Sequence, residues 1–276
     1  MKKALFYMLL STASFSLMNA FIKYLDHIPG FQLVFFRSIT SFVFATTYLI
    51  HHKIPILGNQ RKLLSLRAIA GLISMSLFFL SFKHLPIGTA VSLRYIAPIF
   101  AAIFAVFLLK EKLKPIQFLF FLMAFAGVII LKGFDGNVSN TGMALVITAS
   151  LFTGLVYILI RKIGKGDHPV VVVNYFMFYA TVIGGLICIF NWIQPQGWDW
   201  VLLGSLGVFG YFGQVYMTKA FQAAPTNVVA PIKYTEVIFT IAIGVFWFDD
   251  NYTFWSFLGL LLIIGGLVAN TLVKKN

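Results

Sequence analysis

Residues 71–127 read GLISMSLFFLSFKHLPIGTAVSLRYIAPIFAAIFAVFLLKEKLKPIQFLFFLMAFAG, and a diverged copy of this stretch follows 139 residues later, without a gap, at residues 210–266. Two prolines and a basic–aromatic pair fall in register, whereas aliphatic matches alone would be weak evidence. The matched positions are Phe82 and Phe221, Pro86 and Pro225, Arg94–Tyr95 and Lys233–Tyr234, Ile99–Phe100 and Ile238–Phe239, Val106–Phe107 and Val245–Phe246, and Glu111 and Asp250. The pattern indicates a chain built from two related halves.

Composition places both halves in a lipid bilayer. Hydrophobic residues make up 60% of the chain and charged residues 11%, with a mean hydropathy of +0.91. Such a chain has more apolar surface than a water-soluble core can bury. A spanning helix needs about 20 mostly apolar residues. Segments of this kind lie at about 4–22, 31–50, 67–83, 88–109, 115–132, 141–160, 169–190, 200–219, 227–248 and 253–273.

Ten such segments leave almost no loop and assign five spans to each half. Two repeats with an odd number of spans enter the membrane in opposite orientations, an architecture of many secondary transporters. We therefore predict an all-α integral membrane protein of ten transmembrane helices in one membrane domain. Two inverted-topology five-helix repeats, at residues 1–135 and 139–276, would compose it.

The net charge of +13 would suit a nucleic-acid partner, but its distribution argues against one. If the N-terminus is cytoplasmic, the outer loops hold only Lys23, Lys83 and Lys132. The inner loops and termini hold fifteen basic residues, namely Lys2, Lys3, Lys53, Arg61, Lys62, Arg67, Lys110, Lys112, Lys114, Arg161, Lys162, Lys165, Lys219, Lys274 and Lys275. This positive-inside bias predicts a multi-pass protein of the plasma or inner membrane with cytoplasmic N- and C-termini.

Several function classes lack their motifs in this sequence. There is no G-x-x-x-x-G-K-[ST] loop, so energy from ATP would have to come from another subunit. The single Cys188 permits no intrachain disulfide, and no zinc, haem or iron–sulfur spacing is present. All five histidines lie at the ends of predicted spans, and no cluster of His, Cys or Asp within the spans supplies a nucleophile with a base or a metal site. We therefore predict no enzyme activity, no metal and no cofactor.

The repeated segment resembles the EamA-type repeat of the drug/metabolite transporter superfamily. The residues that carry this likeness are the stretch from Pro98 to Glu111, Ala126-Gly127-Val128, Tyr234 to Glu236, Phe248 to Asp250 and Gly265–Gly266. The resemblance covers the whole chain and implies two repeats of five helices that transport a solute. One position departs from the family pattern, because Val237 stands where the first copy has Pro98. A proline kink is therefore expected in the first copy only.

Four ionisable residues fall inside predicted spans: Arg37, Arg94, Lys233 and Glu236. A charge there costs roughly 2.5–3.5 kcal/mol on insertion scales, so it normally faces a partner or a watery cavity. Lys233 and Glu236 share a helix face. They either neutralise each other, or Glu236 binds a coupling proton or a substrate amine. Arg37 either bonds backbone carbonyls or contacts the substrate. Three basic groups against one acid favour an anionic or zwitterionic solute.

Polar and aromatic residues in the same helices complete the candidate substrate site, although packing is an equal alternative for each. The added candidates are Asn19, Tyr95, Tyr157, Gln214 and Tyr234. Pro86 and Pro225 begin the two helices that carry the charges, and we predict that they act as hinges. A stripe of glycines suits close helix contact, either static or moving. It consists of Gly207, Gly210 and Gly213.

These features predict a secondary active transporter that moves a small organic metabolite by alternating access. An amino acid or a related zwitterion or anion is the expected solute, with export favoured. The alternative is an importer of a cofactor, nucleoside-like or sugar-linked metabolite. A structural or receptor subunit of the membrane is a third interpretation, but it leaves four buried charges without a purpose. We expect transport to be coupled to protons and the protein to be a monomer or a homodimer. We expect no nucleic-acid partner.

Overall fold

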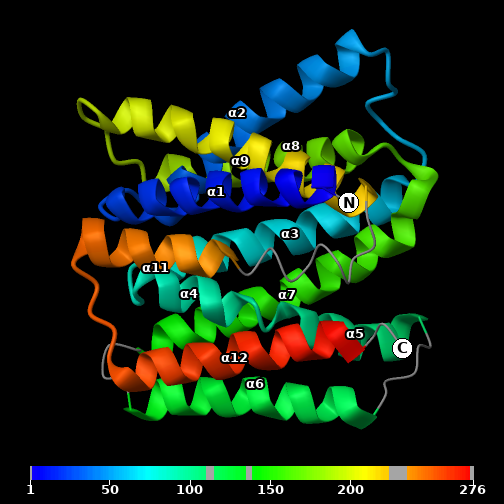
Figure 1. Ribbon diagram of the computed structural model, residues 1–276. Coiled ribbons are helices and arrows are strands. Elements are labelled where there is room, and N and C mark those ends of the chain that lie inside the picture. Colours follow the sequence, from blue (N-terminus) through cyan, green and yellow to red (C-terminus); the bar gives the residue numbers. More distant parts are fainter. Residues whose placement is uncertain (1, 110–114, 135–138, 224–234, 274–276) are drawn as a thin grey trace.

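The computed structural model describes residues 2–109, 115–134, 139–223 and 235–273, and every regular element in these ranges is a helix. The helices form one bundle, in which the first turn of α1 and the last turn of α12 lie at the same end (Figure 1). Their bounds are α1 Lys2–Tyr24, α2 Gly30–His51, α3 Arg61–Ser81, α4 Ile87–Arg94, α5 Ala97–Leu109, α6 Pro115–Phe134, α7 Asn140–Ile163, the 3₁₀ turn η1 Gly164–Gly166, α8 Pro169–Phe190, α9 Asp199–Ala223, α11 Thr235–Phe248 and α12 Phe254–Val273.

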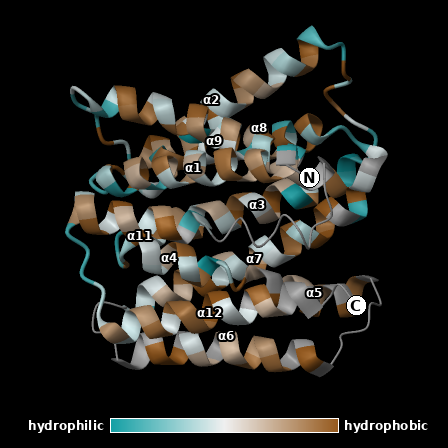
Figure 2. Cartoon of the chain, viewed as in Figure 1, coloured by the Kyte–Doolittle hydropathy of each residue, from teal (hydrophilic) through white to brown (hydrophobic). Residues whose placement is uncertain are grey.

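Seven segments of the described chain are long and apolar enough to cross a membrane. Six of them lie in the single helices α1, α2, α3, α7, α8 and α9, and the seventh, Ile87–Leu108, joins α4 and α5. Shorter apolar segments lie in α11 and α12. Hydrophobic residues cover most helical turns, whereas hydrophilic ones gather near the connections (Figure 2). The predicted all-α class is confirmed, and each of the ten predicted segments contains described helix.

The two halves of the chain interleave. Helix α6 packs on α12, α1 on α9 and α11, α2 on α8 and α9, and α3 on α7 and α8. Helix α4 lies against α7 and α11, and α5 lies against α7. Phe78, Phe82, Ile96 and Ile99 belong to the apolar core that these contacts bury. A site enclosed by the bundle therefore takes residues from both halves of the sequence.

The fourth predicted span, 88–109, is not one continuous helix. Helix α4 ends at Arg94 and α5 begins at Ala97. Pro98 accounts for the break, because proline has no N–H to donate to the carbonyl of Arg94, four residues earlier. The Ser150 hydroxyl on α7 donates to the Val146 carbonyl over 2.8 Å and also lies 3.3 Å from the carbonyl oxygens of both Leu93 and Arg94, so α7 places a donor beside the break. The kink expected in the first copy is thus present.

The start of α4 is capped by the second half of the chain. The Ile87 N–H donates to Oδ2 of Asp250 over 3.2 Å, and the Gly88 N–H donates to the Tyr252 hydroxyl over 3.2 Å. Both acceptors lie in the connection between α11 and α12. Pro86 has no side-chain cap to offer, so these two bonds hold the predicted hinge position. Burial raises the pKa of the Asp250 carboxyl above its ordinary value of 3.8.

We expect Asp250→Ala to lower the free energy of unfolding by about 1 kcal/mol, because the Ile87 N–H loses its acceptor. Asp250→Asn keeps a carbonyl oxygen at this position and should lose much less. Because burial raises the pKa of Asp250, the folded protein holds this proton more tightly than the unfolded chain does. The carboxyl therefore favours folding below pH 3.8 and loses that contribution as the pH rises through its folded pKa.

Thermal unfolding of the wild type and both variants in detergent, from below pH 3.8 upward, measures the loss of stability and its pH dependence. The Asp250→Asn variant should lack the part of the pH dependence that Asp250 contributes. Equal losses of stability in the Asn and Ala variants would contradict a capping role for the Asp250 oxygen.

Candidate functional site

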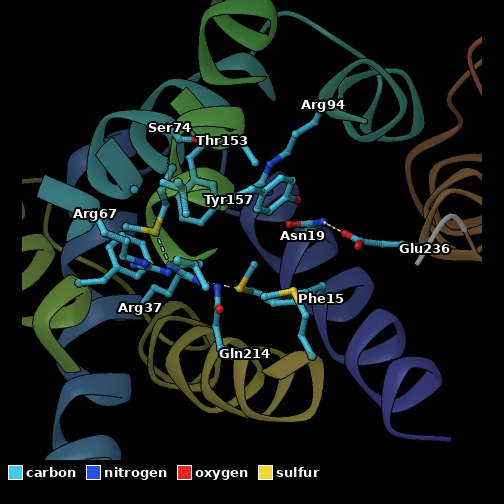
Figure 3. A pocket seen from close by; sticks show the side chains of 18 residues that line it. Phe15, Asn19, Arg37, Arg67, Ser74, Arg94, Thr153, Tyr157, Gln214 and Glu236 are labelled. Carbon is cyan, nitrogen blue, oxygen red and sulfur yellow. Dashed lines mark hydrogen bonds between the residues drawn. The ribbon is translucent and has the colours of Figure 1, made fainter. Parts of the chain in front are cut away.

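A cavity lies inside the bundle between helices of both halves (Figure 3). It leaves about 80 Å³ in which the centre of a water molecule fits. Since one water needs roughly 10–15 Å³ of such space, the cavity has room for several. Its polar and charged lining consists of Asn19, Arg37, Arg67, Ser74, Arg94, Thr153, Tyr157, Gln214 and Glu236.

Arg37 lies on α2 and is 3% exposed. Its Nε donates to the sulfur of Met18 over 3.2 Å, and its Nη1 donates to the sulfur of Met75. Its Cζ lies 5.7 Å from the ring centroid of Phe79 and 5.9 Å from that of Phe176. Thioether sulfur is a weak acceptor, so this guanidinium keeps most of its capacity to bind an anion.

Arg67 is not among the predicted site residues, because the predicted span begins at residue 67 and the charge pattern places this residue with the inner loops. That assignment is wrong, since α3 begins at Arg61 and Arg67 is 4% exposed within it. Its Cζ lies 4.5 Å from the Phe176 ring centroid. Within the described part of the chain, its Nε and Nη1 have no hydrogen-bond partner. Arg67 is therefore a second buried cation beside Arg37.

Arg94 is the last residue of α4 and is partly buried. Its Cζ lies 4.2 Å from the ring centroid of Phe78, a cation–π distance. The break after this residue ends the helix beside the cavity, and the guanidinium lines the cavity wall. The Pro98 break thus positions the third cation of the site.

Glu236 supplies the carboxylate among the described lining residues, from the first turn of α11. Asn19 Nδ2 donates to Oε1 over 3.2 Å, and the Tyr95 hydroxyl donates to Oε2 over 2.8 Å. Both donors come from the first half of the chain, so the carboxylate joins the two halves. An acid in the first turn of a helix also interacts favourably with the helix dipole.

The structure brings together six of the predicted site residues around this cavity: Asn19, Arg37, Arg94, Tyr157, Gln214 and Glu236. Tyr95 contacts Glu236 without lining the cavity. Lys233, Tyr234 and the predicted hinge residue Pro225 lie outside the described residues. The Lys233–Glu236 pair is therefore not described, and its role stays a prediction.

Three further polar lining residues, Arg67, Ser74 and Thr153, are absent from the predicted site. Arg67, Gly71 and Ser74 are spaced i, i+4 and i+7, so they share one face of α3, and this spacing could have indicated a lining face. The Ser74 and Thr153 hydroxyls lie 2.6 Å apart and bridge α3 to α7. Among the described residues, no group of three His, Cys, Asp or Glu side chains could hold a metal ion.

The chain matches the model of the "EamA-like transporter family" twice, over residues 2–132 and 140–272. It is 27% identical to "Solute carrier family 35 member G1" of Homo sapiens, over 98% of this chain and 79% of the relative. It is 23% identical to the "Pseudopaline exporter CntI" of Pseudomonas aeruginosa, over 100% of this chain and 98% of the relative.

Other similarities are more distant. The "S-adenosylmethionine uptake transporter" of Rickettsia prowazekii is 22% identical, over 88% of this chain and 83% of the relative. One crystal structure of a protein superposes with a TM-score of 0.73 at 16% identity, covering 99% of this chain and 98% of the other. That likeness shows a shared fold.

Proposed function

The chain belongs to the EamA-like transporter family, within the drug/metabolite transporter superfamily, and we propose that it is a secondary transporter of a small anionic or zwitterionic metabolite. The observation that carries this proposal is the cavity between both halves, which is lined by three guanidinium groups and one carboxylate among the described residues. Buried charges of this kind mark solute and ion pathways in membrane proteins. The relatives are named as transporters, and members of the family are multi-pass membrane proteins.

Alternating access of two inverted repeats, residues 1–135 and 139–276, is the proposed mechanism. Exchanging α1 with α7, α2 with α8, α3 with α9 and α6 with α12 turns every observed packing of these helices either into another observed packing or, for α2 with α8 and α6 with α12, into itself. For example, α1 on α9 becomes α7 on α3, and α2 on α9 becomes α8 on α3. The double family match supports the same division. An even number of spans, such as ten, brings the two ends of the chain to the same side of the membrane. This agrees with the first turn of α1 and the last turn of α12, which lie at the same end of the bundle (Figure 1).

Roles follow from the contacts of the lining residues. Arg37 and Arg94 would bind acidic groups of the solute, and Asn19, Tyr157 and Gln214 would orient its polar atoms. Glu236, held by Asn19 and Tyr95, would bind a coupling proton or a substrate amine, with Lys233 and Tyr234 as further candidates. Pro86, which precedes the capped start of α4, would act as a hinge together with Pro225.

We propose export across the plasma or inner membrane, with cytoplasmic termini and a monomeric or homodimeric state. An amino acid or a related metabolite is the proposed cargo. The name of the Pseudomonas aeruginosa relative supports export. The name of the Rickettsia prowazekii relative favours the alternative, import of a cofactor-like metabolite. The charge of the cavity suits an anionic group in either case.

Transport itself is tested with purified protein in proteoliposomes. Solutes from a metabolite panel that raise the melting temperature should exchange across vesicles that contain the protein, and not across protein-free vesicles. Arg94→Gln should weaken apparent affinity about tenfold or more, because a charge-assisted hydrogen bond is lost. A solute that stabilises the protein without being carried would contradict the proposal and favour a receptor subunit.

A further inference from the structure

We propose that Arg37 and Arg67 form a second anion-binding subsite in the cavity, so that the transported solute carries two separate carboxylate groups. One carboxylate would lie at Arg37 and Arg67, and the other at Arg94. This inference rests on the transport function proposed above, and it specifies the class of solute.

The Arg67 guanidinium is buried in the bundle without a described hydrogen-bond acceptor for each of its donors. The residue is 4% exposed, and its Nε and Nη1 have no acceptor among the described residues. Burying a charged group without hydrogen bonds is costly. The cavity into which Arg67 faces offers a place for an acceptor that is present when solute is bound.

Arg37 shares the surroundings of Arg67. The Cζ atoms of the two arginines lie 5.9 and 4.5 Å from the centroid of the same Phe176 ring. The hydrogen-bond acceptors of Arg37 are the sulfurs of Met18 and Met75, which are weak acceptors. Two like charges beside one ring repel each other, and the electron-rich ring relieves only part of that repulsion. A carboxylate between the guanidinium groups would bind both.

The other two described charged residues that line the cavity come from other helices, Arg94 from α4 and Glu236 from α11. In Figure 3, Arg37 and Arg67 lie on one side and Glu236 on the other, and Arg94 appears between them. Arg94 contacts a different ring, that of Phe78. Of the described lining residues, three carry a positive charge and one a negative charge, which leaves two positive charges to be balanced by solute.

Carboxylates suit this arrangement because guanidinium presents a planar fork of donors that matches a carboxylate with two parallel hydrogen bonds. A solute with one carboxylate would leave either the Arg37–Arg67 pair or Arg94 without an anion. We therefore infer a dicarboxylate, with or without an amino group that could reach Glu236.

The test compares short dicarboxylates with a monocarboxylate of similar length. Purified protein in detergent is heated with malonate, succinate or glutarate, and separately with butyrate and inorganic phosphate, at equal ionic strength. At least one dicarboxylate should raise the melting temperature more than butyrate and phosphate do. In Arg67→Met, the dicarboxylate concentration for half-maximal stabilisation should rise about tenfold or more. The ligand-free melting temperature of this variant should be equal to or above that of the wild type, because an uncompensated buried charge is removed.

Arg61→Met, an exposed position on the same helix, is the matched control and should leave dicarboxylate binding unchanged. Arg67→Lys keeps the charge without the planar fork and should also weaken binding, which provides a second variant if Arg67→Met folds poorly. Dicarboxylates that stabilise no better than butyrate would overturn the inference, as would equal stabilisation by phosphate alone. Unchanged dicarboxylate binding in both Arg67 variants would also overturn it. A monocarboxylate carried in vesicles by the wild type would defeat this inference while leaving the proposed transport function intact.

Discussion

Replacing Glu236 with Gln is expected to abolish solute accumulation driven by a pH gradient, while downhill exchange of solute persists. Gln keeps the shape of the side chain and one acceptor oxygen, and its amide can donate to the Tyr95 hydroxyl, so the contacts with Asn19 and Tyr95 can re-form. The variant can no longer release and rebind a proton. One proton moving down a gradient of one pH unit supplies about 1.4 kcal/mol, enough for about tenfold accumulation. That factor should fall to one.

The measurement is flux in proteoliposomes with and without an imposed pH gradient. Asp26→Asn, which removes an exposed carboxylate between α1 and α2, is the control and should accumulate solute normally. A combined change of Glu236 to Gln and Lys233 to Met separates coupling from charge cancellation. Full recovery of gradient-driven flux in the double variant would favour a structural ion pair. Normal accumulation in the single variant would eliminate the coupling role.

Some residues that line the cavity could be predicted from the sequence, because charged residues are rare in apolar segments. Arg37, Arg94 and Glu236 were conspicuous for that reason, and all three line the cavity. Arg67 escaped because hydropathy defines the apolar middle of a helix better than its end. Helix α3 extends to Arg61, six residues before the predicted start of the span, so a residue assigned to a loop lies inside the bundle.

Interactions between distant parts of the chain were beyond sequence reasoning. Sequence spacing pairs Glu236 with Lys233 on one predicted helix, whereas the described donors to the Glu236 carboxylate are Asn19 and Tyr95, more than 100 residues away. The repeat matched Asp250 with Glu111 without indicating that Asp250 caps α4. Helical periodicity shows which residues share a face, but the partner of that face depends on how the halves interleave.

The glycine stripe on α9 illustrates how packing and the site depend on each other. Gly207 lies against α2, where a Cβ atom would meet the Cβ of Thr40 and come within 2.8 Å of the Arg37 carbonyl oxygen. At Gly210, a Cβ atom would lie 3.1 Å from Nε of Arg37. The Ser41 hydroxyl also donates to the carbonyl of Gly207 over 2.9 Å. Close approach of α9 thus fixes the part of α2 that carries Arg37.

Gly207→Ala is therefore expected to lower the free energy of unfolding by about 1–3 kcal/mol, because backbone atoms of α2 must move to admit the methyl group. Gly204→Ala, one turn earlier on α9, is the matched control, since a Cβ atom there meets nothing within 4 Å. It should raise the free energy of unfolding by about 0.5–1 kcal/mol, because Ala favours a helix over Gly. Thermal unfolding of both variants in detergent measures the contrast. Equal effects at the two positions would show that helix propensity alone decides the outcome and that α9 does not need glycine to hold α2 and Arg37 in place.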